Sequence, residues 1–117
     1  MWGHFGNPGE NALGLIQVFA FGLFCSVNVL RTRSIWWAAA FHGAWNWTQE
    51  SFYGTIGSGY WFDAHLYQFR PRGKELISGG TAGPEGSIFV FVILAALLSY
   101  EIVMLRRTAA VNRLAIS

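Results

Sequence analysis

The sequence predicts an all-α polytopic membrane protein, a helical bundle with about three full spans preceded by the end of a truncated N-terminal helix. Two features of composition support this prediction: 53% of the 117 residues are hydrophobic, and only 12% are charged. Average soluble domains carry about twice that share of charged residues. A third observation is that apolar runs of membrane-spanning length recur along the chain. We therefore expect residues 1–117 to form a single integral-membrane domain, with the lipid bilayer as a partner.

The predicted spans cover residues 12–30, 35–56 and 87–105. The first contains no ionised residue and, at about 1.5 Å per residue, reaches about 28 Å, close to the hydrocarbon thickness of a bilayer. The second is apolar in its first half and mixed in its second half. The third is the most uniformly apolar of these segments. Its one charged residue, Glu101, is expected near its end, where the carboxylate can reach the interface.

The connecting segments differ in character. Residues 31–34 form a short basic turn, whereas residues 57–84 form a long loop that is rich in glycine. Pro84 and Glu85 suit the first turn of the third helix, because proline lacks the N–H that would be unpaired there and glutamate favours the positive helix end. The glycines before them predict a tight turn with close backbone packing. The residues after Arg106 are predicted to form a short amphipathic stub.

The basic residues predict the orientation in the membrane. The side that holds the short turn and the C-terminus carries Arg31, Arg33, Arg106, Arg107 and Arg113, and the opposite side carries Arg70, Arg72 and Lys74. Because cytoplasmic loops carry an excess of basic residues, the C-terminus is predicted to be cytoplasmic. The net charge of +2, with scattered arginines, does not indicate a nucleic-acid partner.

The second predicted span carries polar side chains along one face. His42 and Asn46 are four residues apart, so they project from the same side of a helix, and Gln49, Glu50 and Tyr53 continue the stripe. A lipid-facing helix would not carry such a stripe, so it is expected to face the bundle interior or a water-filled cavity. The structural alternative is that these groups form hydrogen bonds between helices.

A second histidine, His4, lies in the sequence WGHFGNPGEN, ahead of the first span. The Asn-Pro-Gly turn and the following Glu-Asn pair predict that a helix starts just after it. Antiparallel crossings of the membrane can bring His4 beside the second span. Alternatively, His4 has a structural role near a helix end. Another possible function is a small metal or haem binder that uses His4 and His42.

These motifs, taken in order, resemble the CPBP family of intramembrane proteases, also called the type II CAAX-prenyl endopeptidase or Abi family. The matching segments are WGHFGNPGEN, then RTRSIWWAAAFHGAWNWTQ after a span, then GGTAGPEGS before the last span. The family has a Phe-x-x-x-His motif and, on a later helix, a His-x-x-x-Asn motif. HGAWN, residues 42–46, fits the second motif, and His4 falls where the histidine of the first is expected.

The resemblance implies an α-helical endopeptidase in the bacterial cell membrane that uses a glutamate to activate water. Its substrate would be a membrane-associated peptide or protein, which one branch of the family recognises in prenylated form and which other members process as bacteriocins. His4 would help to hold the water or a metal, and His42 and Asn46 would stabilise the oxyanion. Two histidines plus a carboxylate are an acceptable zinc set, so the candidate metal ligands are His4 and His42 and the candidate cofactor is zinc.

One family feature is missing from the sequence. The Glu-Glu-x-x-x-Arg motif expected upstream of the first histidine has no match, since no glutamate has a glutamate neighbour. The chain therefore resembles the C-terminal part of a larger protease domain, without the expected general base. Glu50 is the one internal substitute that the spacing suggests. The alternative is a non-catalytic membrane module for bacteriocin self-immunity or partner binding.

Overall fold

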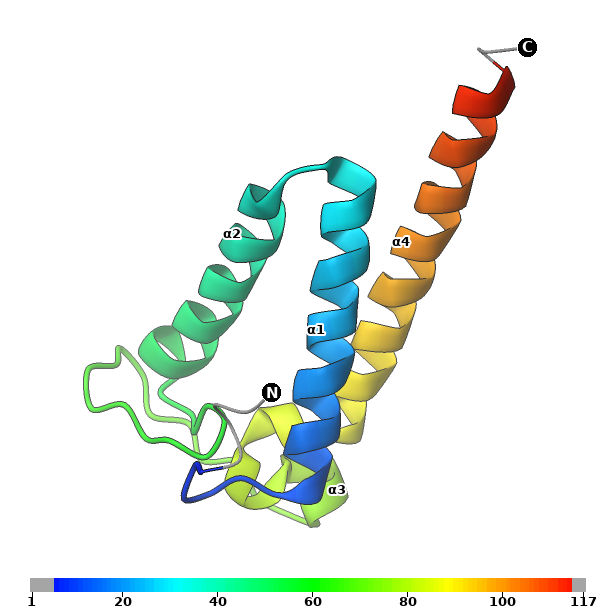
Figure 1. Ribbon diagram of the computed structural model, residues 1–117. Helices are drawn as coiled ribbons and strands as arrows, with labels where there is room; N and C mark the ends of the chain where they lie inside the picture. Colours follow the sequence, from blue (N-terminus) through cyan, green and yellow to red (C-terminus); the bar gives the residue numbers. More distant parts are fainter. Residues whose placement is uncertain (1–5, 115–117) are drawn as a thin grey trace.

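The computed structural model describes residues 6–114, with the side chains of residues 6–111. His4 lies outside the described residues. The described part is helical and contains no strand; one isolated bridge pairs Gly57 with Tyr60. Three long helices dominate, with α1 and α4 side by side and α2 returning antiparallel to α1 (Figure 1): α1 (Ala12–Thr32), α2 (Ile35–Asn46) and α4 (Ile88–Leu114).

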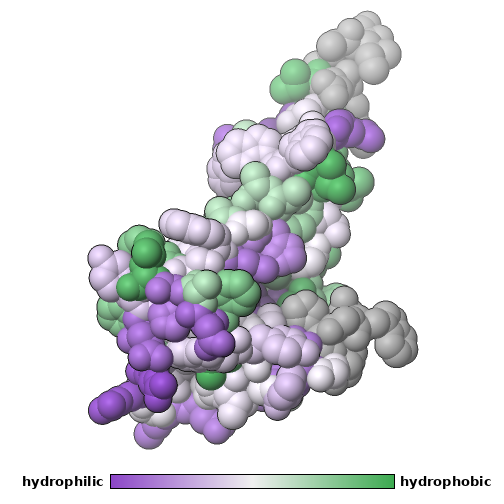
Figure 2. All heavy atoms as spheres, turned by 90° about the vertical axis from the view of Figure 1, so that its left-hand side faces the viewer, coloured by the Kyte–Doolittle hydropathy of each residue, from purple (hydrophilic) through white to green (hydrophobic). Residues whose placement is uncertain are grey.

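Short helical turns occupy the end of the molecule where α1 and α4 begin (Figure 1). In chain order they are the π-helical turn η2 (Trp47–Phe52), α3 (Glu75–Ser78), and the 3-10 turns η3 (Gly80–Ala82) and η4 (Pro84–Gly86). Figure 2 shows hydrophilic surface gathered at this same end of the molecule. The predicted all-α architecture is therefore confirmed.

Within the described residues, two helices are long and apolar enough to cross a membrane: α1 and the stretch Ile88–Val111 of α4. They correspond to the first and third predicted spans. The segment predicted as the second span, 35–56, is helical only as far as Phe52, and its last six helical residues form a π-turn. The structure thus supports two spans, and a third full span is not confirmed. A left-handed glycine, Gly54 with φ of 57°, follows the end of this helical segment.

The final helix differs from its prediction at both ends. Pro84 and Glu85 belong to η4, a separate 3-10 turn, because Ser87 is extended, with φ of −85° and ψ of 148°, and α4 starts only at Ile88. At the other end, α4 continues without a break to Leu114, so the expected amphipathic stub is part of the same helix.

Local sequence explains how α1 and α2 are joined. The Asn11 side chain accepts a hydrogen bond from the Gly14 N–H at 2.9 Å and so caps the start of α1. Arg33 ends α1 in the left-handed conformation, with φ of 57°, and its N–H donates to the Val29 carbonyl. Ser34 then caps α2 through the Trp36 N–H. The basic turn predicted between the two helices is thus a two-residue connection.

An aromatic cluster packs α1 against α2. The Phe21 ring lies 5.7 Å from Phe41, 5.1 Å from His42 and 5.8 Å from Trp45, measured between ring centroids. Phe21 is buried together with Leu94 of α4, so this cluster joins all three long helices. Such aromatic pairs contribute about 0.5–1.5 kcal/mol each beyond the burial of their area.

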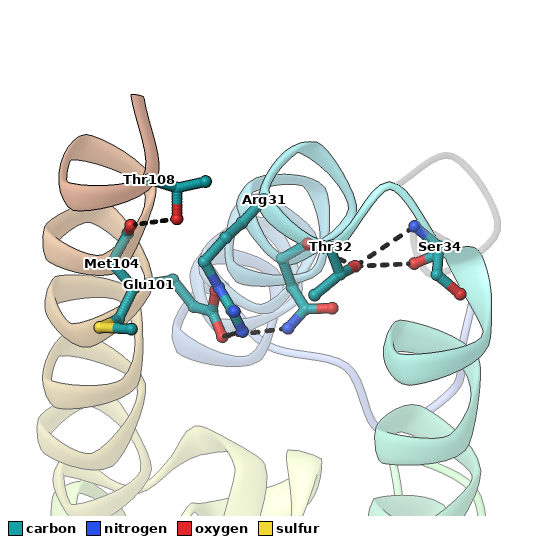
Figure 3. A network of polar contacts seen from close by, with 7 residues as sticks. Arg31, Thr32, Ser34, Glu101, Met104 and Thr108 are labelled. Atoms are coloured by element: carbon teal, nitrogen blue, oxygen red, sulfur yellow. Dashed lines mark hydrogen bonds and ion pairs between the residues drawn. The ribbon is translucent and has the colours of Figure 1, made fainter. Parts of the chain in front are cut away.

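Polar groups hold α1 against α4 nearer the other end of α1 (Figure 3). Glu101 of α4 accepts hydrogen bonds from Asn28 at 3.0 Å and from Arg31 at 2.5 and 3.1 Å. Glu101 is only 4% exposed and lies in the middle of α4, so the expectation that its carboxylate reaches the interface at the helix end is wrong. The prediction failed for two reasons: α4 extends beyond the predicted end at residue 105, and α1 provides hydrogen-bond partners for the carboxylate.

Glycine permits the tight packing of the turns before α4. A Cβ at Gly79 would lie 1.6 Å from the Gly83 carbonyl oxygen, and a Cβ at Gly83 would lie 2.0 Å from that of Ile56. Both glycines also have positive φ, 85° and 78°. The predicted tight turn is confirmed, and its consequence is that η4 is pressed against the loop that follows η2.

Candidate active site

His42 and Asn46 both line one pocket between α1 and α2, with a volume of about 250 Å³. They lie one helical turn apart on α2, as the spacing predicts. The remaining lining comes from α1, from the loop after η2 and from η4: Gln17, Val18, Phe21, Gly22, Cys25, Trp45, Ser58 and Glu85. The structure therefore brings the two candidate oxyanion donors together in one cavity.

Three polar side chains in this pocket keep unused hydrogen-bonding capacity. Within the described residues 6–111, neither the His42 imidazole nor the amides of Asn46 and Gln17 make a hydrogen bond. His42 is exposed and Asn46 is half-buried, whereas Gln17 is only 2% exposed. An imidazole and two amides can donate or accept, so the pocket is suited to a ligand with carbonyl and N–H groups.

Glu85 is the buried carboxylate of the pocket, at 6% exposure. One of its oxygens accepts from the Trp45 indole N–H at 3.1 Å. The other accepts from Ser58, from the backbone N–H at 2.9 Å and from the hydroxyl at 2.7 Å. Asn7 in turn donates to the Ser58 carbonyl at 2.7 Å. Glu85 thereby connects η4, α2 and the loop after η2 around the pocket.

Sequence reasoning assigned Glu85 to a helix end and did not place it in the site. The signal available in the sequence was a lone carboxylate enclosed by glycines, between a loop and an apolar helix. The burial of Glu85 depends on the close approach of η4 to the loop after η2, which no local pattern reveals. Gln17 was missed for a similar reason, since an amide in an apolar run does not reveal which face is buried.

The polar stripe predicted along α2 is split by the π-turn. His42 and Asn46 line the 250 Å³ pocket. Gln49 instead donates to the Ile56 carbonyl at 2.8 Å and, with Tyr53, lines a different cavity. The physical reason is that a π-turn has more residues per turn than an α-helix, so residues after Trp47 leave the face that His42 starts. The prediction of one continuous stripe is therefore wrong.

Glu50, the substitute base considered from the sequence, is not among the residues that line the pocket. Its carboxylate lies against Gly57, where a Cβ would be 2.4 Å from Oε1. Burial raises the pKa of Glu50, and the nearby negative charge of Glu85 raises it further, while His42 opposes the shift. Of these two glutamates, it is Glu85 that lies in the pocket with His42.

A second, apolar groove of about 510 Å³ lies beside the polar pocket and shares Trp45 with it. Its wall is formed by aromatic and small side chains together with a few polar ones: Phe41, Ala44, Trp45, Thr48, Gln49, Tyr53, Thr55, Phe69, Pro84 and Val90. The hydrogen bond to Glu85 fixes the indole of Trp45 between the two spaces. A ligand with an apolar part and a polar part could use both.

The metal prediction rests on His4, which lies outside the described residues, and on His42. Within residues 6–111, no group of three or more His, Cys, Asp or Glu side chains is placed to hold a metal ion. The donors described around the pocket therefore do not make up a zinc site. The role of His4 as a ligand remains a prediction.

Comparison with known proteins agrees with the resemblance found in the sequence. Residues 1–48 match the family described as Rce1-like, type II CAAX prenyl endopeptidase. This match supports membership of the CPBP family of CAAX proteases, a family of intramembrane metalloprotease-like hydrolases. The matched region includes α1 and the whole of α2, and therefore both His42 and Asn46. Neither curated proteins nor solved structures gave a match.

Proposed function

We propose that this chain contributes the oxyanion-stabilising half of an intramembrane endopeptidase, one that cleaves membrane-associated peptides of the CAAX or bacteriocin-processing type by means of activated water. One observation carries the proposal. His42 and Asn46, which fit the family's His-x-x-x-Asn motif, line the same pocket and make no hydrogen bond within the described residues. Donors that are held in place, and that make no hydrogen bond with the described residues, are suited to a charge that develops only during reaction.

In this proposal, water attacks the carbonyl carbon of a peptide bond, and the carbonyl oxygen becomes negatively charged. The Asn46 amide and an N–H of the His42 imidazole donate to that oxygen. The residues packed around them limit their movement, since the Phe21 ring contacts both His42 and Trp45. Preorganised donors of this kind lower the barrier because no reorganisation is needed at the moment of reaction.

Glu85 is proposed to position the site rather than to act as the base. Its two oxygens already accept three hydrogen bonds, from Trp45 and from Ser58, so its lone pairs are largely engaged. The water-activating glutamate is proposed to come from a Glu-Glu motif in a segment that precedes residue 1. His4 is proposed to help hold the water or a metal ion.

The proposed location is a bacterial cell membrane, crossed by α1 and α4, with the C-terminus in the cytoplasm. The ends of α1 and α2 that carry Arg31 and Arg33 lie at the same end of the molecule as the C-terminal half of α4 (Figure 1). Arg106 and Arg107 belong to that half of α4. The proposed substrate reaches the pocket from the membrane. The proposal includes substrates that carry a prenyl group.

The test is peptide cleavage by the protein purified from its native membrane, with its intact mass measured first. Cleavage of a membrane-bound peptide library is followed by mass spectrometry, and His42→Ala is compared with wild type. His65→Ala is the matched control, because His65 lies in the loop and its ring nitrogen contacts the Phe62 carbonyl. Loss of cleavage in His42→Ala alone supports the proposal. Cleavage by His42→Ala at the wild-type rate would contradict it.

A non-catalytic module is the second candidate, and the engagement of Glu85 in three hydrogen bonds favours it, because the pocket then holds no carboxylate free to act as a base. An intact mass of 13.0 kDa, combined with no cleavage of any peptide, would support this candidate. A larger mass with His42-dependent cleavage would support the protease.

A further inference from the structure

Gln17 occupies an unusual position on the wall of the pocket opposite His42 and Asn46. It lies on α1, is 2% exposed, and makes no hydrogen bond within the part of the chain that the structure describes. Two other buried amides do donate hydrogen bonds to the protein: Gln49 donates to the Ile56 carbonyl, and Asn28 donates to Glu101, although Asn28 Oδ1 has no partner within the described residues. The Gln17 amide is not among the fully enclosed atoms without a partner, and Gln17 lines the pocket, so its polar atoms remain accessible to a ligand there.

The antiparallel packing of α1 and α2 brings Gln17 to the level of Asn46. The Phe21 ring contacts the His42 ring at 5.1 Å, which sets the register of the two helices. Gln17 is one turn before Phe21 on α1, and Asn46 is one turn after His42 on α2. Since the helices run in opposite directions (Figure 1), both steps lead toward the same end of the molecule. The two amides therefore face the pocket from opposite sides.

An amide side chain carries both a donor and an acceptor, which matches the C=O and N–H of a peptide group. The pocket lies next to the apolar groove, and Trp45 belongs to both. An extended peptide can thus place one backbone group between the two amides while an apolar side chain enters the groove. A purely hydrocarbon ligand would leave the Gln17 amide unpaired, so a peptide backbone suits the pocket better.

We propose that Gln17 is a substrate-binding residue, which hydrogen-bonds a backbone peptide group next to the bond presented to His42 and Asn46. This inference rests on the proposed function, since it takes a peptide as the ligand. It extends that function by assigning a residue on α1 to substrate recognition. The contact requires no chemical step at Gln17, so it is expected to act on affinity more than on turnover.

The experiment measures the binding of a fluorescein-labelled, apolar pentapeptide amide by fluorescence anisotropy, with the protein in lipid nanodiscs and empty nanodiscs as background. Gln17→Leu is expected to bind about tenfold more weakly, as for one lost hydrogen bond to a buried group. Gln68→Leu is the matched control, because Gln68 lies in the exposed loop. Replacing single peptide groups by esters should reveal one position that weakens binding to wild type and leaves binding to Gln17→Leu unchanged.

Thermal unfolding separates this role from a structural one. Since the Gln17 amide makes no hydrogen bond within residues 6–111, Gln17→Leu is expected to unfold at or above the wild-type temperature. Unfolding several degrees lower would mean that the amide supports the fold, and it would overturn the proposal. Equal peptide affinity in wild type and Gln17→Leu would overturn it and leave the proposed function standing. If wild type bound no peptide, the proposed function would fail and this inference with it.

Discussion

Glu101 of α4 and Arg31 of α1 form an ion pair, with Oε2 and Nε 2.5 Å apart, in the region where the two candidate membrane-spanning helices pack together (Figure 3). The Glu101 side chain is 5% exposed and that of Arg31 is 24% exposed. Asn28 adds a hydrogen bond to the same carboxylate. A charge so deeply covered is tolerated because it is paired and hydrogen-bonded, which ties the position of α4 along its axis to that of α1.

Glu101→Ala is predicted to lower the free energy of unfolding by about 3 kcal/mol, the lower end of the range for breaking a buried ion pair, since Arg31 is partly exposed. Thermal unfolding in nanodiscs measures the effect. Glu75→Ala, at an exposed position, serves as the control and should change little. The double variant Arg31→Leu with Glu101→Leu should recover most of the loss, and an equally unstable double variant would contradict this explanation.

Asn46→Ala is predicted to lower kcat by about two to three powers of ten, the usual effect of removing one oxyanion donor. KM should change little, because the donor acts mainly on the transition state. Steady-state cleavage by the protein from its native membrane provides both constants. A rise in KM with kcat unchanged would assign Asn46 to substrate binding instead.

Glu85→Gln is predicted to weaken both the fold and the site. It keeps the shape of the side chain, but it replaces one carboxylate oxygen with an NH2 group, which cannot accept the hydrogen bond from Trp45 or those from Ser58, whichever side it occupies. A hydrogen bond to a charged group contributes about 1.5–3 kcal/mol, so a drop of that order in unfolding free energy is expected. The fluorescence of Trp45, measured in a background where the other tryptophans are phenylalanine, should shift as the indole loses its partner. An unchanged spectrum would show that Glu85 does not position Trp45.

Glu50→Gln is predicted to stabilise the protein at neutral pH. Burial raises the pKa of Glu50, and Glu85 raises it further, so the folded state favours the protonated form. The stability that follows from this shift is fully present below the unfolded-state pKa and is lost as the pH rises through the raised folded-state pKa. The unfolding temperatures of wild type and Glu50→Gln should thus differ at pH values above that window and become equal in acid. A constant difference at all pH values would rule out Glu50 titration as the cause.

The orientation can be tested with single cysteines in a Cys25→Ser background. One cysteine replaces Lys74, at the end of the molecule that carries the long loop, and the other replaces Thr108, in the C-terminal half of α4. If the C-terminus is cytoplasmic, a membrane-impermeant thiol reagent should label position 74 in intact cells and position 108 only after the membrane is opened. The reverse pattern would mean that the basic residues do not set the topology as proposed.

The sequence alone determined the helical class and the spacing of the candidate oxyanion pair. Both follow from local rules, because apolar length predicts a span and a separation of four residues places His42 and Asn46 on one helix face. The family resemblance was also carried by short motifs that can be read directly, and the match over residues 1–48 supports it. The caps at Asn11 and Ser34 are likewise local features.

Only the tertiary structure decided which other groups join that pair. Gln17 and Glu85 are distant from His42 in sequence, and the register of α1 against α2 and the approach of η4 bring them to one pocket. The π-turn after Asn46 could not be predicted from the sequence pattern either, and it directs Gln49 away from that pocket. Glu101 was expected at the membrane interface, but in the structure it is paired with Asn28 and Arg31 of α1. In each case the contact joins separate elements, so its existence depends on packing between them rather than on any local pattern of residues.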